Sequence, residues 1–271
     1  MVDPIFDLVN SNFSHRSGGV LIDEKSKGTY AFVLSCTDPK DGNILNETRL
    51  GELLKLIKTC LRTGSNLLIA AYAGGERKLN DDGCPKDDRT FSQGLCLPGN
   101  NPSTSHMNLY NRVVNNMKIL SCKRTVIAMI NGAMDASLFS LLNACSFNIV
   151  SEYAFIDYGL SDSAHDTADV IHGLDMVSKI KDGGIALYLL LHPKHRYRGK
   201  DLYTFGLADC FIPEARFGYL GSRIRNFGHH LGENQFQQLL ENEKVYPGPS
   251  SIEVWKTEIE KCFEVGLFYL K

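Results

Sequence analysis

Residues 125–160 read TVIAMINGAMDASLFSLLNACSFNIVSEYAFIDYGL, and the rest of the chain is arranged around them. The apolar run at residues 126–130 predicts a buried strand, and Asn131-Gly132 ends that strand in a turn. Small residues then lead into a short apolar helix, a second strand and a loop. We expect these elements to form the centre of a layered α/β domain, and we expect the loop to carry chemistry.

The composition indicates a globular protein with one large core, or with one core and an accessory lobe. The chain has 271 residues, of which 43% are hydrophobic and 22% are charged. Its net charge is −2, so binding to nucleic acid would need a local basic patch. The longest apolar run, at residues 185–191, is shorter than the roughly 18 to 20 residues that span a bilayer, so no membrane span is expected.

Cysteine usage and the N-terminus bear on the compartment. The eight cysteines are scattered without CxxC spacing, which favours buried, reduced thiols in an intracellular protein over a disulfide framework. Near the N-terminus, Asp3 and Asp7 accompany a single early arginine, Arg16, which fits neither a secretory signal peptide nor a mitochondrial presequence. We interpret residues 1–17 as a leader segment, compatible with earlier removal of an import signal.

Strands and helices alternate in the first part of the chain. Residues 18–23 and 29–36 flank a glycine-containing turn, which predicts a β-hairpin. Asn46 is placed to cap a helix whose apolar residues recur at helical spacing. Residues 67–71 predict a buried strand.

A polar segment precedes the central stretch. Residues 74–104 are rich in Gly, Asp, Asn and Pro, and they predict a long loop that covers part of the domain. Ser105 is the predicted cap of the helix that follows. After residue 160, residues 209–212 predict a short strand. The helices predicted there are residues 174–180, 184–191, 200–205, 219–227, 233–240 and 252–263.

The segment that begins at Asn131-Gly132 resembles the Asn-Gly-x-x-x-Gly-Gly-Gly motif of the crotonase (enoyl-CoA hydratase/isomerase) superfamily. Ala136, Ser137 and Leu138 stand where that family has its three glycines. In the family, backbone N–H groups at this helix N-terminus stabilise a thioester oxygen as it becomes negative. The resemblance implies an α/β fold with a crotonase-like ββα superhelical core and a degenerate active site.

Further segments extend the resemblance over roughly residues 18–215. Residues 72–78 (YAGGERK) match the end of a family strand. Three other segments resemble the 3-hydroxyisobutyryl-CoA hydrolase branch in particular. They are residues 112–124 (RVVNNMKILSCKR) leading to residues 126–132 (VIAMING), residues 184–191 (GIALYLLL) and residues 198–209 (RGKDLYTFGLAD). We therefore expect a crotonase-like core at residues 18–212 and a helical C-terminal region at residues 213–271.

The resemblance also implies which amides would hold the thioester oxygen. In this chain they are the backbone N–H groups of Asn80 and Ser137. Asp81 and Asp82 follow Asn80, where the family keeps small neutral residues, and their negative charge opposes binding of an oxyanion and of the CoA phosphates. Leu138 adds bulk to a turn that the family keeps clear.

An active hydrolase of this branch also needs an acid or base from a Pro-Glu segment. Here the corresponding residues, 155–160, read FIDYGL, and a shift of two or three residues would bring in Asp157 or Asp162. Asp166, next to His165, is the candidate for the later acidic residue. The favoured alternative is that these three aspartates are ordinary loop carboxylates and that the histidine is solvated or hydrogen-bonded.

Other constellations carry less weight. Ser137 and Ser140 lack the Gly-x-Ser-x-Gly elbow of a serine hydrolase, and Cys145 is interpreted as a core residue. Four histidines lack an acidic partner at fixed helical spacing, so a structural or surface role is favoured and no metal is expected. These histidines are His192, His195, His229 and His230.

Two basic-aromatic stretches are the candidates for RNA contact. One is residues 194–200 (KHRYRGK), and the other is residues 216–225 (RFGYLGSRIR). Clustered cations bind phosphates and exposed rings stack on bases, although a solvated face is the favoured alternative. The cations of the first stretch are Lys194, Arg196, Arg198 and Lys200.

Two functional classes remain. The first is a catalytically degenerate crotonase-fold protein that is a structural or interaction subunit of a larger mitochondrial assembly, either a ribosomal small subunit or a respiratory complex. It would need no cofactor, its partners would be protein subunits, and homo-oligomers are compatible with it. The alternative is an active acyl-CoA hydrolase, hydratase or isomerase that binds a CoA thioester at a rearranged oxyanion hole. We favour the first because both oxyanion turns and the Glu position have changed together.

Overall fold

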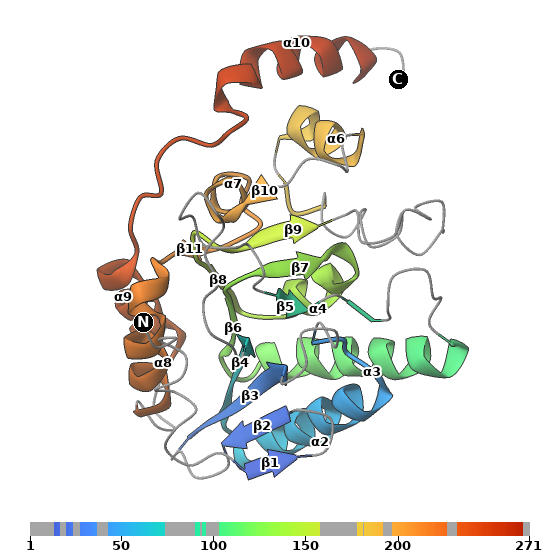
Figure 1. Cartoon of the computed structure of the whole chain (residues 1–271), viewed down its shortest axis with the longest axis vertical. Helices are drawn as coiled ribbons and strands as arrows, with labels where there is room; N and C mark the ends of the chain where they lie inside the picture. Colours follow the sequence, from blue (N-terminus) through green and yellow to red (C-terminus); the bar gives the residue numbers. More distant parts are fainter. Residues whose placement is uncertain are drawn as a thin grey trace, which may run out of the picture.

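The computed structural model describes residues 14–16, 20–23, 28–36, 43–73, 90–92, 94–95, 103–157, 178–180, 182–191, 197–226 and 232–267. Two sheets organise these residues (Figure 1). The larger sheet has the strand order β1-β2-β3-β4-β6-β8-β11. Its strands are β1 (Ser14–Arg16), β2 (Val20–Asp23), β3 (Thr29–Cys36), β4 (Asn66–Ala73), β6 (Val126–Ile130), β8 (Phe147–Val150) and β11 (Cys210–Phe211).

The two edges of the larger sheet differ in strand direction. β2 pairs with β3 in antiparallel fashion, which confirms the predicted hairpin. From β3 onward, neighbouring strands are parallel, and the pairing ends with β11 beside β8. Parallel strands need long crossover connections, which here contain the helices.

The smaller sheet has the order β10-β9-β7-β5. Its strands are β5 (Thr90–Ser92), β7 (Ala133–Asp135), β9 (Phe155–Asp157) and β10 (Tyr197–Arg198). The chain gives one strand to each sheet on each turn, so β4 is followed by β5, β6 by β7 and β8 by β9. This alternation, closed by a helix on each turn, confirms the predicted ββα superhelical core. It also corrects the prediction of a continuous loop at residues 74–104, because β5 lies inside that segment.

Two long helices precede β4 and β6. In α2 (Glu47–Thr63), the side chain of Asn46 accepts a hydrogen bond of 2.9 Å from the Arg49 amide, which confirms the predicted cap. In α3 (Thr104–Ser121), the cap is Ser103 and not Ser105, because the helix begins one residue before the predicted cap. The earlier start places His106 on the first turn, where its Nε2 lies 2.8 Å from the carbonyl oxygen of Leu45.

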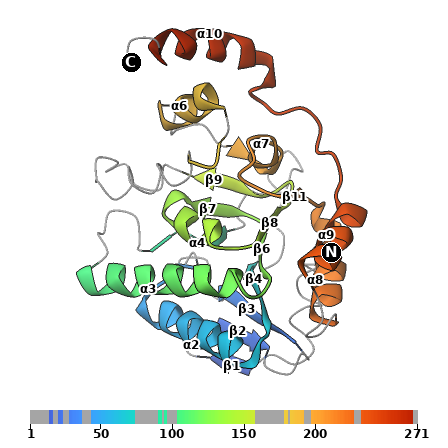
Figure 2. The ribbon, with the colours of Figure 1, turned by 180° about the vertical axis from the view of Figure 1, so that it is seen from behind.

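Both faces of the larger sheet are covered, as parallel sheets require. Phe32, Ile69 and Ala128 belong to a core cluster with residues of α2, α3 and the smaller sheet. The residues that alternate with them along the strands face a second cluster with α8 (Phe217–Asn226) and α9 (Glu233–Glu243). Figure 2 shows these two helices on the opposite side of the sheet from α2 and α3.

The C-terminal segment is anchored by a buried carboxylate. Asp201 lies in α7 (Gly199–Thr204), and its Oδ1 accepts hydrogen bonds from Ser250 Oγ, Ser251 N and Ser251 Oγ at 2.7 to 2.9 Å. The chain then forms a short 3-10 turn, η5 (Glu253–Trp255), and α10 (Lys256–Leu267), which packs on α6 (Gly183–Leu191) far from α2 (Figure 1). The division into core and C-terminal region at residue 213 stays a prediction.

Within the described part of the chain, every helix is too short or too polar to cross a bilayer.

Candidate functional site

The candidate site lies at the turn after β6 and β7. Gly132 has a φ of 148°, a backbone conformation that residues other than glycine rarely adopt. β7 ends at Asp135, and the chain then turns into η2 (Ala136–Leu138) and α4 (Phe139–Asn143). Oδ1 of Asp135 accepts a hydrogen bond of 2.8 Å from the Ser137 amide. Asp135 is therefore the N-cap of this helical turn. Its carboxylate accepts the hydrogen bond of the Ser137 amide, which is one of the two amides predicted to hold a thioester oxygen.

A second segment closes over this turn. Gly94 has a φ of +92°, and a Cβ built on it would lie 2.6 Å from Ser137 Oγ and 2.7 Å from Asp135 Oδ1. The Gly94 amide donates to Ser92 Oγ at 3.2 Å, and its carbonyl oxygen accepts from the Leu45 amide at 2.9 Å. These contacts hold the backbone at residue 94 against the cap, where only glycine fits.

Tyr110 of α3 fixes the position of Ser137 through hydrogen bonds to the turn. The Tyr110 hydroxyl donates to the carbonyl oxygen of Ser137 at 2.8 Å and accepts from the Leu141 amide at 3.3 Å. The Ser137 side chain is 9% exposed, and its Oγ has no hydrogen-bond partner among the described residues. The turn is thus rigidly placed, and its backbone amide is already used.

The structure describes only some of the predicted site residues. Ser137 lies at the cap as described, whereas Asn80, Asp162 and Asp166 lie outside the described residues, as do Asp81, Asp82 and His165. Asp157 is the last residue of β9, and its Cα is paired with that of Asp135 in the neighbouring parallel strand. Neighbouring strands lie roughly 5 Å apart, so the backbone of Asp157 is close to the cap.

Sequence reasoning missed three contributors, which are Asp135, Gly94 and Tyr110. The Asp-Ala-Ser order at residues 135–137 is a local N-cap signature, and it could have identified the first. Gly94 and Tyr110 carry no such signal, because they reach Ser137 only through the parallel pairing of β5 with β7 and the packing of α3.

A buried polar cluster joins the carboxyl ends of three parallel strands. Asn131 follows β6, and its Nδ2 donates to Glu214 Oε1 at 3.2 Å. Ser151 follows β8, and its Oγ donates to Asn131 Oδ1 at 2.5 Å. Such strand ends are common ligand sites in α/β sheets. Here the side chains bind one another, because Glu214 is 4% exposed and Ser151 fully buried, so the cluster ties the strands together.

The described cysteines and histidines form no metal site. Cys145 is buried, which confirms its interpretation as a core residue, and burial raises the pKa of its thiol to about 12. In the part of the chain that the structure describes, no three His, Cys, Asp or Glu side chains are grouped so that they could hold a metal ion. The histidines at positions 192, 195, 229 and 230 lie outside that part.

The basic stretches are only partly placed. Lys194 and Arg196 lie outside the described residues, while Arg198 is exposed and Lys200 is half-buried in the first turn of α7. In the second stretch, Arg223 Nη1 lies 3.2 Å from Glu243 Oε1, and Arg216 Nη1 lies 3.9 Å from Glu243 Oε2. The Arg223 guanidinium also lies 5.5 Å from the centre of the Tyr219 ring. These contacts within the chain reduce the positive charge that the second stretch presents to phosphates.

Comparison with known proteins supports the fold. The sequence matches no family model, and the comparison with curated proteins found no match. Solved structures do match. The enoyl-CoA hydratase of Mycobacterium smegmatis superposes with a TM-score of 0.58, at 17% identity over 77% of each chain. A monofunctional enoyl-CoA isomerase from M. smegmatis gives 0.54, at 19% identity over 78% of this chain and 87% of its own.

A third match is the enoyl-CoA hydratase of Bacillus anthracis, with a TM-score of 0.57 and 16% identity over 78% of each chain. Identities this low say nothing about chemistry, but the agreement extends over most of each chain. Together with the two sheets and the ββα repeat, these matches show that the chain has the crotonase fold of the enoyl-CoA hydratases and isomerases.

Proposed function

We propose that this chain is a catalytically degenerate crotonase-fold protein, similar to 3-hydroxyisobutyryl-CoA hydrolase, that acts as a structural or interaction subunit of a larger mitochondrial assembly. A ribosomal small subunit and a respiratory complex are the two assemblies we consider. The observation that carries the proposal is the hydrogen bond from the Ser137 amide to Asp135 Oδ1. It takes up the donor that an active relative would aim at a thioester oxygen.

The negative charge of Asp135 also disfavours an oxyanion at this site. A thioester oxygen that becomes negative beside this amide would meet the carboxylate of Asp135 at close range. Two like charges 4 Å apart repel by about 1 kcal/mol in water and about 4 kcal/mol at the effective dielectric constant of a protein surface. Removing one donor from an oxyanion hole costs roughly 3 to 4 kcal/mol, so loss and repulsion act in the same direction.

The framework around the turn supports a retained structural role. Two apolar clusters cover both faces of the larger sheet, and the Asn131–Ser151–Glu214 cluster ties its strand ends. Changes confined to the site leave such a scaffold able to present surfaces to partner subunits. A fold does not require its ancestral chemistry to persist.

Two measurements test the proposal. Calorimetric titration of the purified chain with 3-hydroxyisobutyryl-CoA and short acyl-CoA thioesters should show no saturable binding, and chromatography should detect no released CoA. Sedimentation of the tagged protein from mitochondrial extract should place it in a large particle. Micromolar thioester binding with turnover would reverse the first result, and migration as a free chain of about 30 kDa would reverse the second.

The alternative is an active acyl-CoA hydrolase, hydratase or isomerase, and one observation favours it. The pairing of β7 with β9 puts two aspartates, Asp135 and Asp157, on neighbouring strands beside Ser137. Aspartates serve as general acids and bases in many enzymes, and this register brings the backbones of two of them to one place. If turnover is found, Asp157→Asn should abolish it, whereas an unchanged rate would assign the base to another group.

A further inference from the structure

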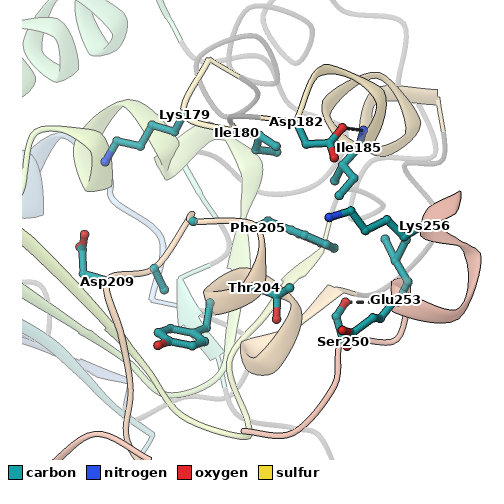
Figure 3. A pocket seen from close by; sticks show the side chains of 14 residues that line it. Lys179, Ile180, Asp182, Ile185, Thr204, Phe205, Asp209, Ser250, Glu253 and Lys256 are labelled. Atoms are coloured by element: carbon teal, nitrogen blue, oxygen red, sulfur yellow. Dashed lines mark hydrogen bonds between the residues drawn. The ribbon is translucent and has the colours of Figure 1, made fainter. Parts of the chain in front are cut away.

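A cavity lies between the core and the C-terminal segment. It has a volume of about 540 Å³, within the range of roughly 300 to 1,000 Å³ typical of small-molecule sites. Its walls come from the residues before α6, the turn after α7 and the segment that leads into α10 (Figure 3). The Asp201 hydrogen bonds to Ser250 and Ser251 hold this segment in place.

This cavity is separate from the Ser137 site. The cap at Asp135 follows the carboxyl end of β6, and Gly199 at the start of α7 packs on the Ser151 carbonyl at the carboxyl end of β8. The cavity lies beyond the other end of α7, where Asp209 pairs with Asn148 near the amino end of β8. A ligand bound there would not touch the candidate oxyanion turn.

The lining has an apolar floor and a charged rim. The floor is made by side chains that are at most 8% exposed, and they include Ile180, Ile185, Phe205, Ala208 and Ile252. Figure 3 shows the charged groups at two ends. Lys179 and Asp209 lie at one end, and Asp182, Glu253 and Lys256 lie at the other.

The acidic groups are largely engaged by the protein itself. Asp182 Oδ1 accepts hydrogen bonds from the Gly184 and Ile185 amides at 3.0 and 3.1 Å, and caps α6. Asp209 Oδ2 accepts from the Asn148 amide at 2.7 Å. Glu253 is exposed on the rim.

Lys256, by contrast, lines the cavity from the start of α10, and in the view of Figure 3 its side chain points toward Phe205. Its contact with Glu260 is long, at 3.8 Å, and both side chains are about half exposed to solvent, so this pair is weak. Lys256 therefore places a weakly paired ammonium at the rim of the cavity, beside the apolar floor.

We propose that this cavity binds a small amphiphilic carboxylate. Its anionic head would meet the Lys256 ammonium, and its apolar body would lie on Phe205, Ile185 and Ile252. An ion pair at the edge of an apolar pocket is stronger than one in water, and burial of the tail supplies the remaining affinity. Because Lys256 belongs to α10 and Ile185 to α6, the ligand bridges the C-terminal helix and the core.

The chain contains a built-in reporter for this site. Trp255 is its single tryptophan, is 61% exposed, and lies between the two lining residues Glu253 and Lys256. Titration of the full chain with decanoate should change the tryptophan fluorescence with saturation at one molecule per chain, and calorimetry should give the same stoichiometry. Decylamine, which has the same tail and a positive head, should bind more weakly.

Variants distinguish the cavity from non-specific uptake. Lys256→Gln should weaken decanoate binding about tenfold, the loss expected for a hydrogen bond to a charged group. Lys58→Gln, an exposed lysine of α2 far from the cavity, is the matched control and should leave affinity unchanged. Circular dichroism verifies that both variants fold.

Three results would overturn the proposal. They are unsaturable uptake of decanoate, equal affinity of the Lys256→Gln variant and the native chain, and tighter binding of decylamine than of decanoate. The test is independent of the pseudoenzyme proposal, because acyl-CoA turnover is measured separately and involves the other end of the strands.

Discussion

The Ser137 amide donates its hydrogen bond to Asp135 Oδ1 at 2.8 Å, and the backbone of Gly94 is packed against both side chains. The Ser137 amide is thus satisfied by the residue that caps its own helical turn. A neutral small residue at position 135 would leave that amide without an internal partner.

Two substitutions of Asp135 should distinguish the effect of its charge on thioester binding from the effect of its hydrogen bond to the Ser137 amide. Asp135→Ala removes the cap, so it should lower the free energy of unfolding by about 1 kcal/mol and free the Ser137 amide. We expect this variant to gain measurable acyl-CoA affinity by calorimetry. Asp135→Asn keeps an acceptor oxygen without the charge, and it should retain stability and still bind no thioester. Equal thioester binding by both variants would show that charge alone closes the site.

Gly199 should tolerate no side chain. A Cβ at this position would lie 1.9 Å from the carbonyl oxygen of Ser151, which is backbone and cannot rotate away. Gly199→Ala should therefore lower the free energy of unfolding by about 3 kcal/mol, measured by urea denaturation. Gly51→Ala is the matched control in α2, where a Cβ meets nothing within 4 Å, and it should stabilise the protein by up to about 1 kcal/mol. Similar midpoints for the two variants would contradict the packing at Ser151.

Asp201 should control the attachment of the C-terminal segment. It is 1% exposed, and Asp201→Ala would leave donors of Ser250 and Ser251 without their acceptor. Loss of such a buried charged acceptor costs about 3 kcal/mol, so hydrogen exchange of residues 250–262 should accelerate while that of α2 stays slow. Ser251→Ala removes only the bond from Ser251 Oγ and should have a smaller effect. Unchanged exchange in the Asp201→Ala variant would mean that α10 is held by its packing on α6 alone.

Buried thiols should make the fold sensitive to alkaline pH. Burial raises the pKa of Cys60, Cys145 and Cys210 from 9.0 to about 12. Below pH 9 these thiols are protonated in both states, but above it the unfolded chain loses protons that the folded chain keeps. Stability should therefore fall as pH rises from about 9 toward 12, by up to about 1.4 kcal/mol per pH unit for each thiol. Denaturation at several pH values checks this slope, and replacement of Cys145 by Ala should reduce it.

Local sequence determined much of the fold. The apolar runs at β4, β6 and β8 are buried on both faces, and the burial pattern of each strand follows directly from its side chains. The Asn46 cap was equally readable, because capping involves residues three positions apart. Ser103 was harder to identify, since Ser103 and Ser105 are two serines at the same helix start and a tertiary contact of His106 accompanies the earlier start.

Contacts between distant segments could not be predicted from local sequence patterns. β5 is three residues long and lies inside a polar segment, so no periodicity reveals it before β7 provides a partner. The approach of Gly94 to Ser137, the register of Asp135 with Asp157 and the contact of Asp201 with Ser250 all join residues far apart in the chain.

The amino-acid sequence by itself determined which segments are apolar, that Asn46 caps α2 and that Ala136, Ser137 and Leu138 form the turn before α4. Only the tertiary structure decided that Asp135 occupies the Ser137 amide beneath Gly94, and that α10 closes a cavity over α6 and α7. The physical reason is the separation along the chain of the residues that interact. Strand and helix patterns arise between neighbouring residues, whereas a site or cavity forms only when the superhelix brings distant residues within hydrogen-bonding or packing distance.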